Sequence, residues 1–199
     1  MKSFSGDVCL PKSNWYWSSE PNSWVLSQEE HLKIQASLGE DIFYMPGIRE
    51  VNNVCVYERC LTGNFTLEVS ITVEGSEFAD AGGILVRTDT SQWLKACIER
   101  SRLLKWAVFT VFTTPYSDEA CGPTLKLGKG ILRLTREGNR FAFFYKSEDK
   151  QDWKFVRTCW WTVPERVYVG LFTQAPFSNK CSAEFSHLKL YPWAAPDCR

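Results

Sequence analysis

The segment AGGILVRTDTSQWLKACIER, residues 81–100, carries side chains suited to binding a polar ligand. If its two halves pair as antiparallel strands around residues 89–92, successive side chains alternate between two faces of the sheet. One face is apolar and is predicted to join the core: Ile84, Val86, Leu94, Ala96 and Ile98. The other carries two cations, an indole and a carboxylate: Arg87, Trp93, Lys95 and Glu99. Rings contact the apolar surface of a ligand and charged groups hold its hydroxyl or carboxylate groups, so this face predicts a site for a saccharide or a similar polar small molecule.

The charges of this face also allow a purely structural interpretation. Lys95 and Glu99 would then pair across an exposed sheet surface, where ion pairs contribute little stability. We expect Arg87 over the Trp93 ring, in a cation–π contact that both interpretations allow.

Signals of catalysis are weak. A glycosidase needs two carboxylates about 5–9.5 Å apart, which alternate positions of one strand can supply. The sequence contains no Glu-x-Asp or Asp-x-Glu pair, no nucleophile elbow and no phosphate-binding loop. A glycoside hydrolase or lyase in which Glu99 pairs with a carboxylate of another strand remains an alternative.

The strands that must position these residues are indicated by short runs rich in Val, Ile, Phe, Tyr, Trp and Thr between turn residues. The runs lie at 54–60, 64–74, 82–88, 92–100, 106–113, 131–136, 140–146, 153–158, 167–174 and 181–190. Turn residues join the third run to the fourth, the sixth to the seventh and the seventh to the eighth as hairpins. Antiparallel strands without helices bury their apolar faces by stacking as two sheets. We therefore predict an all-β sandwich that forms one domain over residues 1–199.

Charge and hydropathy argue against two classes of partner. Lys plus Arg and Asp plus Glu both number 23, so no net field attracts nucleic acid or an acidic membrane surface. No run approaches the roughly 18 apolar residues of a membrane span, and residues 1–15 lack the apolar core of a signal peptide. The sequence predicts a cytoplasmic protein that binds neither nucleic acid nor membrane.

The cysteines bear on redox state and metal binding. There are eight: Cys9, Cys55, Cys60, Cys97, Cys121, Cys159, Cys181 and Cys198. Without a CxxC pair, and with only two histidines, the chain is predicted to hold no metal ion or other cofactor. Free thiols fit a cytoplasmic protein, and a disulfide framework in a secreted protein is the alternative.

Five segments resemble a known family. In order they are WYWSSEPNSW, DAGGILVRTDTSQWLKACIER, TPYSD, LRLTREGNRFAFFYKSEDKQDWKFVRT and VYVGLFTQAP. Over residues 15–190 the chain is similar to the YesU-type family of largely uncharacterised proteins. The resemblance implies a concanavalin A-like lectin/glucanase fold, a jelly-roll of two antiparallel sheets whose concave face binds carbohydrate. It also links the chain to fungal cytosolic proteins described as regulators of enolase.

The family positions carried over to this chain are candidates for the lining of the concave face. They are Glu20, Arg87, Trp93, Lys95, Glu99, Asp118, Arg133 and Arg157. The chain departs from the family at Ser19, where relatives have asparagine, and at Glu119-Ala120, where an aromatic residue of the relatives is missing. The second departure removes a stacking surface for sugars.

These features lead to one preferred function and two alternatives. The preferred function is a non-catalytic sandwich that recognises a saccharide or similar polar ligand on its concave face. The first alternative is a cytosolic interaction module that regulates a metabolic enzyme such as enolase. The second is a glycoside hydrolase or lyase, which rests on fold analogy alone.

Overall fold

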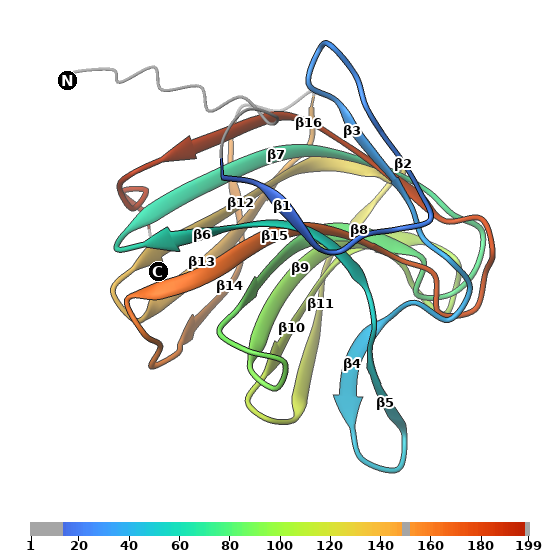
Figure 1. The fold of residues 1–199 in the computed structure, drawn as a ribbon, viewed down its shortest axis with the longest axis horizontal. Coiled ribbons are helices and arrows are strands. Elements are labelled where there is room, and N and C mark those ends of the chain that lie inside the picture. The colour runs from blue at the N-terminus through green and yellow to red at the C-terminus, as the bar shows by residue number, and fades with distance from the viewer. Residues whose placement is uncertain (1–13, 149–151, 198–199) are drawn as a thin grey trace.

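The protein is a sandwich of two antiparallel sheets, and the computed structural model describes residues 14–148 and 152–197 (Figure 1). The first seven-stranded sheet, sheet A, consists in spatial order of β1 (Tyr16–Ser19), β6 (Cys55–Thr62), β15 (Arg166–Gln174), β8 (Ala81–Arg87), β9 (Trp93–Arg100), β10 (Trp106–Thr113) and β11 (Ser117–Leu125). The second, sheet B, consists of β14 (Lys154–Trp160), β13 (Arg140–Lys146), β12 (Lys129–Glu137), β7 (Phe65–Glu74), β16 (Ser182–Tyr191), β3 (Leu32–Gln35) and β2 (Ser23–Leu26). The predicted fold class is confirmed.

A separate hairpin projects from the body of the sandwich (Figure 1). It consists of β4 (Ile42–Met45) and β5 (Arg49–Asn52), which pair only with each other. The apolar side chains Ile42 and Phe43 at its base pack on the outer face of sheet A. The hairpin therefore forms a wall beside that face.

The ten predicted runs correspond to β6–β10 and β12–β16, and the three predicted hairpins form. The strands that the prediction missed are β1–β5 and β11. The first five contain four residues each, too few for alternation to stand out. β11 reads SDEACGPTL, and its glycine and proline are typical of a turn.

The hairpin of β8 and β9 has the predicted register, and its two faces enter different apolar clusters. Opposite each other are Arg87 and Trp93, Leu85 and Lys95, and Gly83 and Cys97. The residues predicted to face inward, Ile84, Val86, Leu94, Ala96 and Ile98, lie in the core between the sheets. The outward residues Leu85, Trp93 and Cys97 form a second cluster with the base of the β4–β5 hairpin. This second cluster covers much of the face that was predicted to bind ligand.

The described cysteines are free thiols: Cys55, Cys60, Cys97, Cys121, Cys159 and Cys181. Cys9 and Cys198 lie outside the described residues. Within residues 14–148 and 152–197, the chain forms no helix with the length and hydropathy of a membrane span.

Candidate functional site

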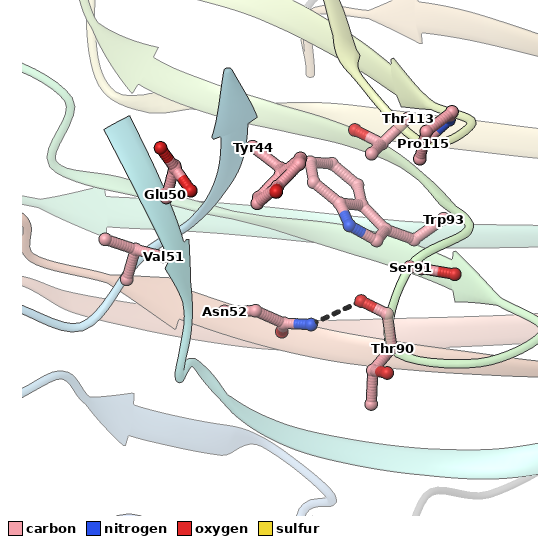
Figure 2. A pocket seen from close by; sticks show the side chains of 9 residues that line it. All are labelled: Tyr44, Glu50, Val51, Asn52, Thr90, Ser91, Trp93, Thr113 and Pro115. Carbon is pink, nitrogen blue, oxygen red and sulfur yellow. Dashed lines mark hydrogen bonds between the residues drawn. The ribbon is translucent and has the colours of Figure 1, made fainter. Parts of the chain in front are cut away.

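Three cavities lie on the outer face of sheet A, beside the loop that joins β8 to β9. The hairpin pocket, of about 610 Å³, is lined by Tyr44, Glu50, Val51, Asn52, Thr90, Ser91, Trp93, Thr113 and Pro115 (Figure 2). The arginine pocket, of about 580 Å³, is lined by Tyr16, Trp17, Ser18, Glu58, Arg87, Thr88, Asp89, Thr90 and Tyr168. A central pocket of about 150 Å³ shares lining residues with both. We call the three together the groove.

The hairpin pocket has an aromatic wall supplied by the β4–β5 hairpin. Tyr44 is 38% exposed and stacks on Tyr116, with ring centroids 6.2 Å apart and planes 9° from parallel. Trp93 also lines this pocket but is only 1% exposed, because the second apolar cluster surrounds its indole. A ligand in this pocket can therefore contact the Tyr44 ring over a wide area, whereas only a small part of Trp93 is accessible to it.

The arginine pocket contains an ion pair between Arg87 on β8 and Glu58 on β6, two strands of sheet A that flank β15. Arg87 donates from Nε to Glu58 Oε2 at 2.9 Å and from Nη2 to Glu58 Oε1 at 2.6 Å. The Glu58 side chain is 2% exposed and that of Arg87 is 25% exposed, so the carboxylate of this bidentate pair is shielded from water while the guanidinium keeps some contact with it. Gly170 leaves room for it, since a Cβ there would lie 2.9 Å from the Glu58 Cβ.

The predicted contact between Arg87 and the Trp93 ring does not form. Arg87 and Trp93 are opposite each other in the β8–β9 register, as expected. The Arg87 guanidinium is held by Glu58, which lies on β6 beyond the intervening strand β15. The cation above the indole is instead Lys95, with Nζ 5.9 Å from the ring centroid.

The loop between β8 and β9 is held in shape by Asp89. Its Oδ1 accepts hydrogen bonds from Ser91 N, Ser91 Oγ and Gln92 N at 2.7, 2.8 and 2.9 Å. These bonds, first of all that from the Ser91 backbone, lower the pKa of Asp89. The ordered loop presents the carbonyl of Thr90 to the β4–β5 hairpin, where Asn52 Nδ2 donates to it at 2.7 Å (Figure 2).

Lys95 and Glu99 are buried and line none of the three cavities. They are 2% and 3% exposed, so the interpretation as an exposed surface pair is wrong. Lys95 Nζ donates to Ile42 O at 3.1 Å and to Gln174 Oε1 at 2.9 Å, which ties the base of the hairpin to sheet A. Burial raises the pKa of Glu99 to about 7.

The four remaining candidates lie away from the groove. Arg133, on β12, belongs to sheet B, where it pairs with Glu68, so its predicted place on the same face is wrong. Arg157 and Asp118 form an ion pair of 3.1 Å between the edge strands β14 and β11, and neither lines a cavity of the groove. Glu20 accepts a hydrogen bond of 2.8 Å from Trp24 Nε1 and is likewise absent from the lining.

The sequence-based prediction missed several lining residues. Tyr44 and Asn52 come from the short hairpin strands, and Tyr16 comes from the edge strand β1. Glu58 lay in a predicted strand, and its charge within VCVYERC was a signal that could have been used. Tyr168 gave none, since a tyrosine is an ordinary strand residue.

The carboxylates around the cavities are already engaged by the protein. Glu58 is paired with Arg87, Asp89 holds its own loop, and Glu50 Oε1 accepts a bond of 3.1 Å from Gly47 N. The described residues contain no group of three or more His, Cys, Asp or Glu side chains arranged to hold a metal ion. This arrangement suits reversible binding through rings, hydroxyls and amides.

The chain is similar to a protein family and to several solved structures. The model of a family described as "Protein of unknown function (DUF1349)" matches residues 17–192, and no curated protein matches the sequence. A functionally unknown protein from Saccharomyces cerevisiae has a similar structure, with a TM-score of 0.83, 22% identity, and coverage of 92% of this chain and 98% of that one.

Two further structures relate the fold to carbohydrate-active proteins. A GH43 protein from Bacillus licheniformis matches with a TM-score of 0.71 and 16% identity over 94% of this chain, which spans only 38% of that longer protein. The carbohydrate binding module CBM66 from Bacillus subtilis matches with a TM-score of 0.53 and 14% identity over 89% of this chain and 95% of the module. At these identities the likeness shows a shared β-sandwich fold.

Proposed function

Since the chain belongs to the family described as "Protein of unknown function (DUF1349)", we propose a function from its own site: non-catalytic binding of a saccharide, or of a similarly hydroxylated molecule, in the groove of sheet A. The observation that carries the proposal is the pairing of two roomy cavities with accessible tyrosines and neutralised charges. Cavities of 610 and 580 Å³ lie within the roughly 300–1,000 Å³ typical of small-molecule sites.

The chemistry of the lining matches that of a sugar. A sugar ring has an apolar face of C–H groups and a rim of hydroxyls that both donate and accept hydrogen bonds. Tyr44 and Tyr168 supply rings with hydroxyl groups, while the exposed Thr90 and Ser91 supply further hydroxyls. Because Arg87 is already paired with Glu58, an uncharged ligand can bind without breaking an ion pair.

The structural neighbours support this choice of ligand class without assigning it. One is a carbohydrate binding module and another is a xylan beta-1,4-xylosidase from Bacillus halodurans, matched with a TM-score of 0.67. This chain spans 39% of the xylosidase, so the activity of that enzyme is not carried over. Xylo-oligosaccharides are therefore the first probes to test.

Calorimetric titration with neutral oligosaccharides tests the proposal. We expect Tyr44→Ala and Tyr168→Ala each to weaken binding by about tenfold, which corresponds to about 1.4 kcal/mol, because each removes a contact ring. Trp160→Ala is the matched control, since Trp160 is 69% exposed on β14 of sheet B, away from the groove. Binding that survives both tyrosine substitutions unchanged, or a failure to bind any neutral saccharide, would refute the proposal.

A second candidate function is the regulation of a metabolic enzyme such as enolase in the cytoplasm, the function implied by the YesU-type resemblance. One structural observation favours a protein-binding role. Phe78 and Phe177 stack with centroids 5.8 Å apart, and Arg102 and Arg49 cap their outer faces at 4.5 and 5.0 Å. The neighbouring Leu103 is 79% exposed. Together these residues place apolar and cationic groups on one surface.

Purified enolase and this protein should be tested for direct binding by surface plasmon resonance. If the second candidate holds, Leu103→Ser weakens the complex, because it removes an exposed apolar contact, whereas Trp160→Ala leaves it unchanged. Absence of a complex at micromolar concentrations of both proteins would count against this role. A tagged protein localised by microscopy tests the proposed cytoplasmic location separately.

A further inference from the structure

The three cavities of the groove lie next to one another and share lining residues. The central pocket shares Asn52 and Thr90 with the hairpin pocket, and it shares Ser18, Arg87 and Asp89 with the arginine pocket. Two wide cavities of about 610 and 580 Å³ thus lie on either side of a small one of about 150 Å³. This order of large, small and large cavities matches a ligand in which a slender linkage joins two bulky units.

The small central pocket is bordered by groups that hydrogen bonds hold in place. Asn52 Nδ2 donates to Thr90 O at 2.7 Å, which links the end of β5 to the β8–β9 loop (Figure 2). Asn52 pairs with Ile42 in the hairpin, and the Ile42 carbonyl accepts the bond from the buried Lys95. The loop on the other side is held by the Asp89 hydrogen bonds. Both sides of the central pocket are therefore anchored to sheet A.

The charges along the groove favour a neutral ligand. Arg87 is the one cation among the described residues that line the three cavities, and Glu58 already binds it through two hydrogen bonds. An acidic sugar would have to draw Arg87 away from a carboxylate that is 2% exposed, at the cost of leaving that carboxylate unpaired. A neutral chain needs no such exchange.

We propose that the groove binds a linear neutral oligosaccharide in two linked subsites, one in the hairpin pocket and one in the arginine pocket. The glycosidic linkage between them passes the Asn52–Thr90 bridge. This inference rests on the proposed function and deepens it. Each subsite alone binds weakly, and a chain that fills both gains affinity because its second unit binds at a high effective concentration.

The test is a calorimetric series of β-1,4-linked xylose oligomers from xylose to xylohexaose, with the matching glucose series and an oligogalacturonate series. We expect the affinity for a neutral series to rise at least tenfold from the monosaccharide to the oligomer that fills both subsites, and then to level off. Tyr44→Ala removes a ring from one subsite and Tyr168→Ala from the other. Either variant should abolish most of this gain, whereas the control Trp160→Ala should retain it.

The possible results separate this inference from the function on which it rests. Equal affinity for monosaccharide and hexasaccharide overturns the two-subsite arrangement and leaves saccharide binding intact. Tighter binding of oligogalacturonate than of either neutral series overturns the neutral ligand class. Absence of binding to all three series overturns both the inference and the proposed function.

Discussion

Replacement of Arg87 by methionine should destabilise the protein strongly, because it leaves a buried carboxylate without its cation. The Glu58 side chain is 2% exposed and receives two hydrogen bonds from Arg87, at 2.9 and 2.6 Å. Removing one partner of a buried ion pair costs about 3–5 kcal/mol. Since the Arg87 side chain is 25% exposed, water partly screens the pair, and we expect a loss of about 3 kcal/mol.

The assays are urea and thermal denaturation of the wild type, Arg87→Met, Glu58→Gln and the double variant. For a chain of 199 residues, a loss of about 3 kcal/mol corresponds to a fall in Tm of about 6–12 °C. The double variant removes both charges and should lose only about 1 kcal/mol, because no unpaired charge remains buried. Glu58→Gln should lose at most about 1 kcal/mol, because Arg87 is 25% exposed and stays partly hydrated, so the double-mutant cycle should give a coupling energy of about 2–3 kcal/mol.

One result would refute this reasoning. If Arg87→Met and the double variant lose the same stability, the cost comes from lost packing of the arginine stem rather than from an unpaired carboxylate. High salt provides an internal check, since shielded pairs are screened less than exposed ones. A loss that disappears in 1 M salt would show that the pair is accessible to ions.

Three further predictions concern groups outside the ligand contacts. Burial raises the pKa of Glu99 from 4.5 to about 7, so the folded state retains a proton that the unfolded state loses, and stability falls as pH rises from about 4.5 to 7. Glu99→Gln should therefore match the wild type near pH 4 and exceed it by up to about 3 kcal/mol at pH 8 in urea titrations, whereas equal pH profiles would contradict the assignment. Arg136→Met should lower the free energy of unfolding by about 3 kcal/mol, because the guanidinium donates to three backbone carbonyls, those of Gly138, Pro164 and Glu165. Thermal denaturation measures this loss, and a value below about 1 kcal/mol would show that water replaces those bonds. Iodoacetamide followed by peptide mass spectrometry should modify the exposed Cys121 in the native protein and Cys97 only after unfolding, and native labelling of Cys97 would show that the cluster beneath the hairpin opens.

Residues close together in the sequence were predicted well. The turn at residues 89–92 sets the register of β8 and β9, and strand alternation then determines which side chains share a face. That is why Leu94 and Ile98 enter the core while Trp93 and Lys95 point to the other side, as expected. The sandwich followed from the same local signals, because strands without helices must stack to bury their apolar faces.

Exposure and partners required the tertiary structure. Whether Lys95 meets solvent depends on the β4–β5 hairpin, whose base lies on sheet A. Arg133 and Arg87 each follow an apolar residue in a predicted strand, yet β12 belongs to sheet B and β8 to sheet A. Glu58 reaches Arg87 only because β15 pairs with both β6 and β8 and so holds these two strands on either side of itself.

The sequence by itself determined the direction of each side chain within its strand, since backbone geometry alternates that direction at every residue. Only the tertiary structure decided which strands became neighbours, which face the hairpin covered and which charges met. Those outcomes depend on pairing and packing between segments far apart in the chain, such as Asn52 with Thr90. The pattern of residues within one short segment does not determine such contacts.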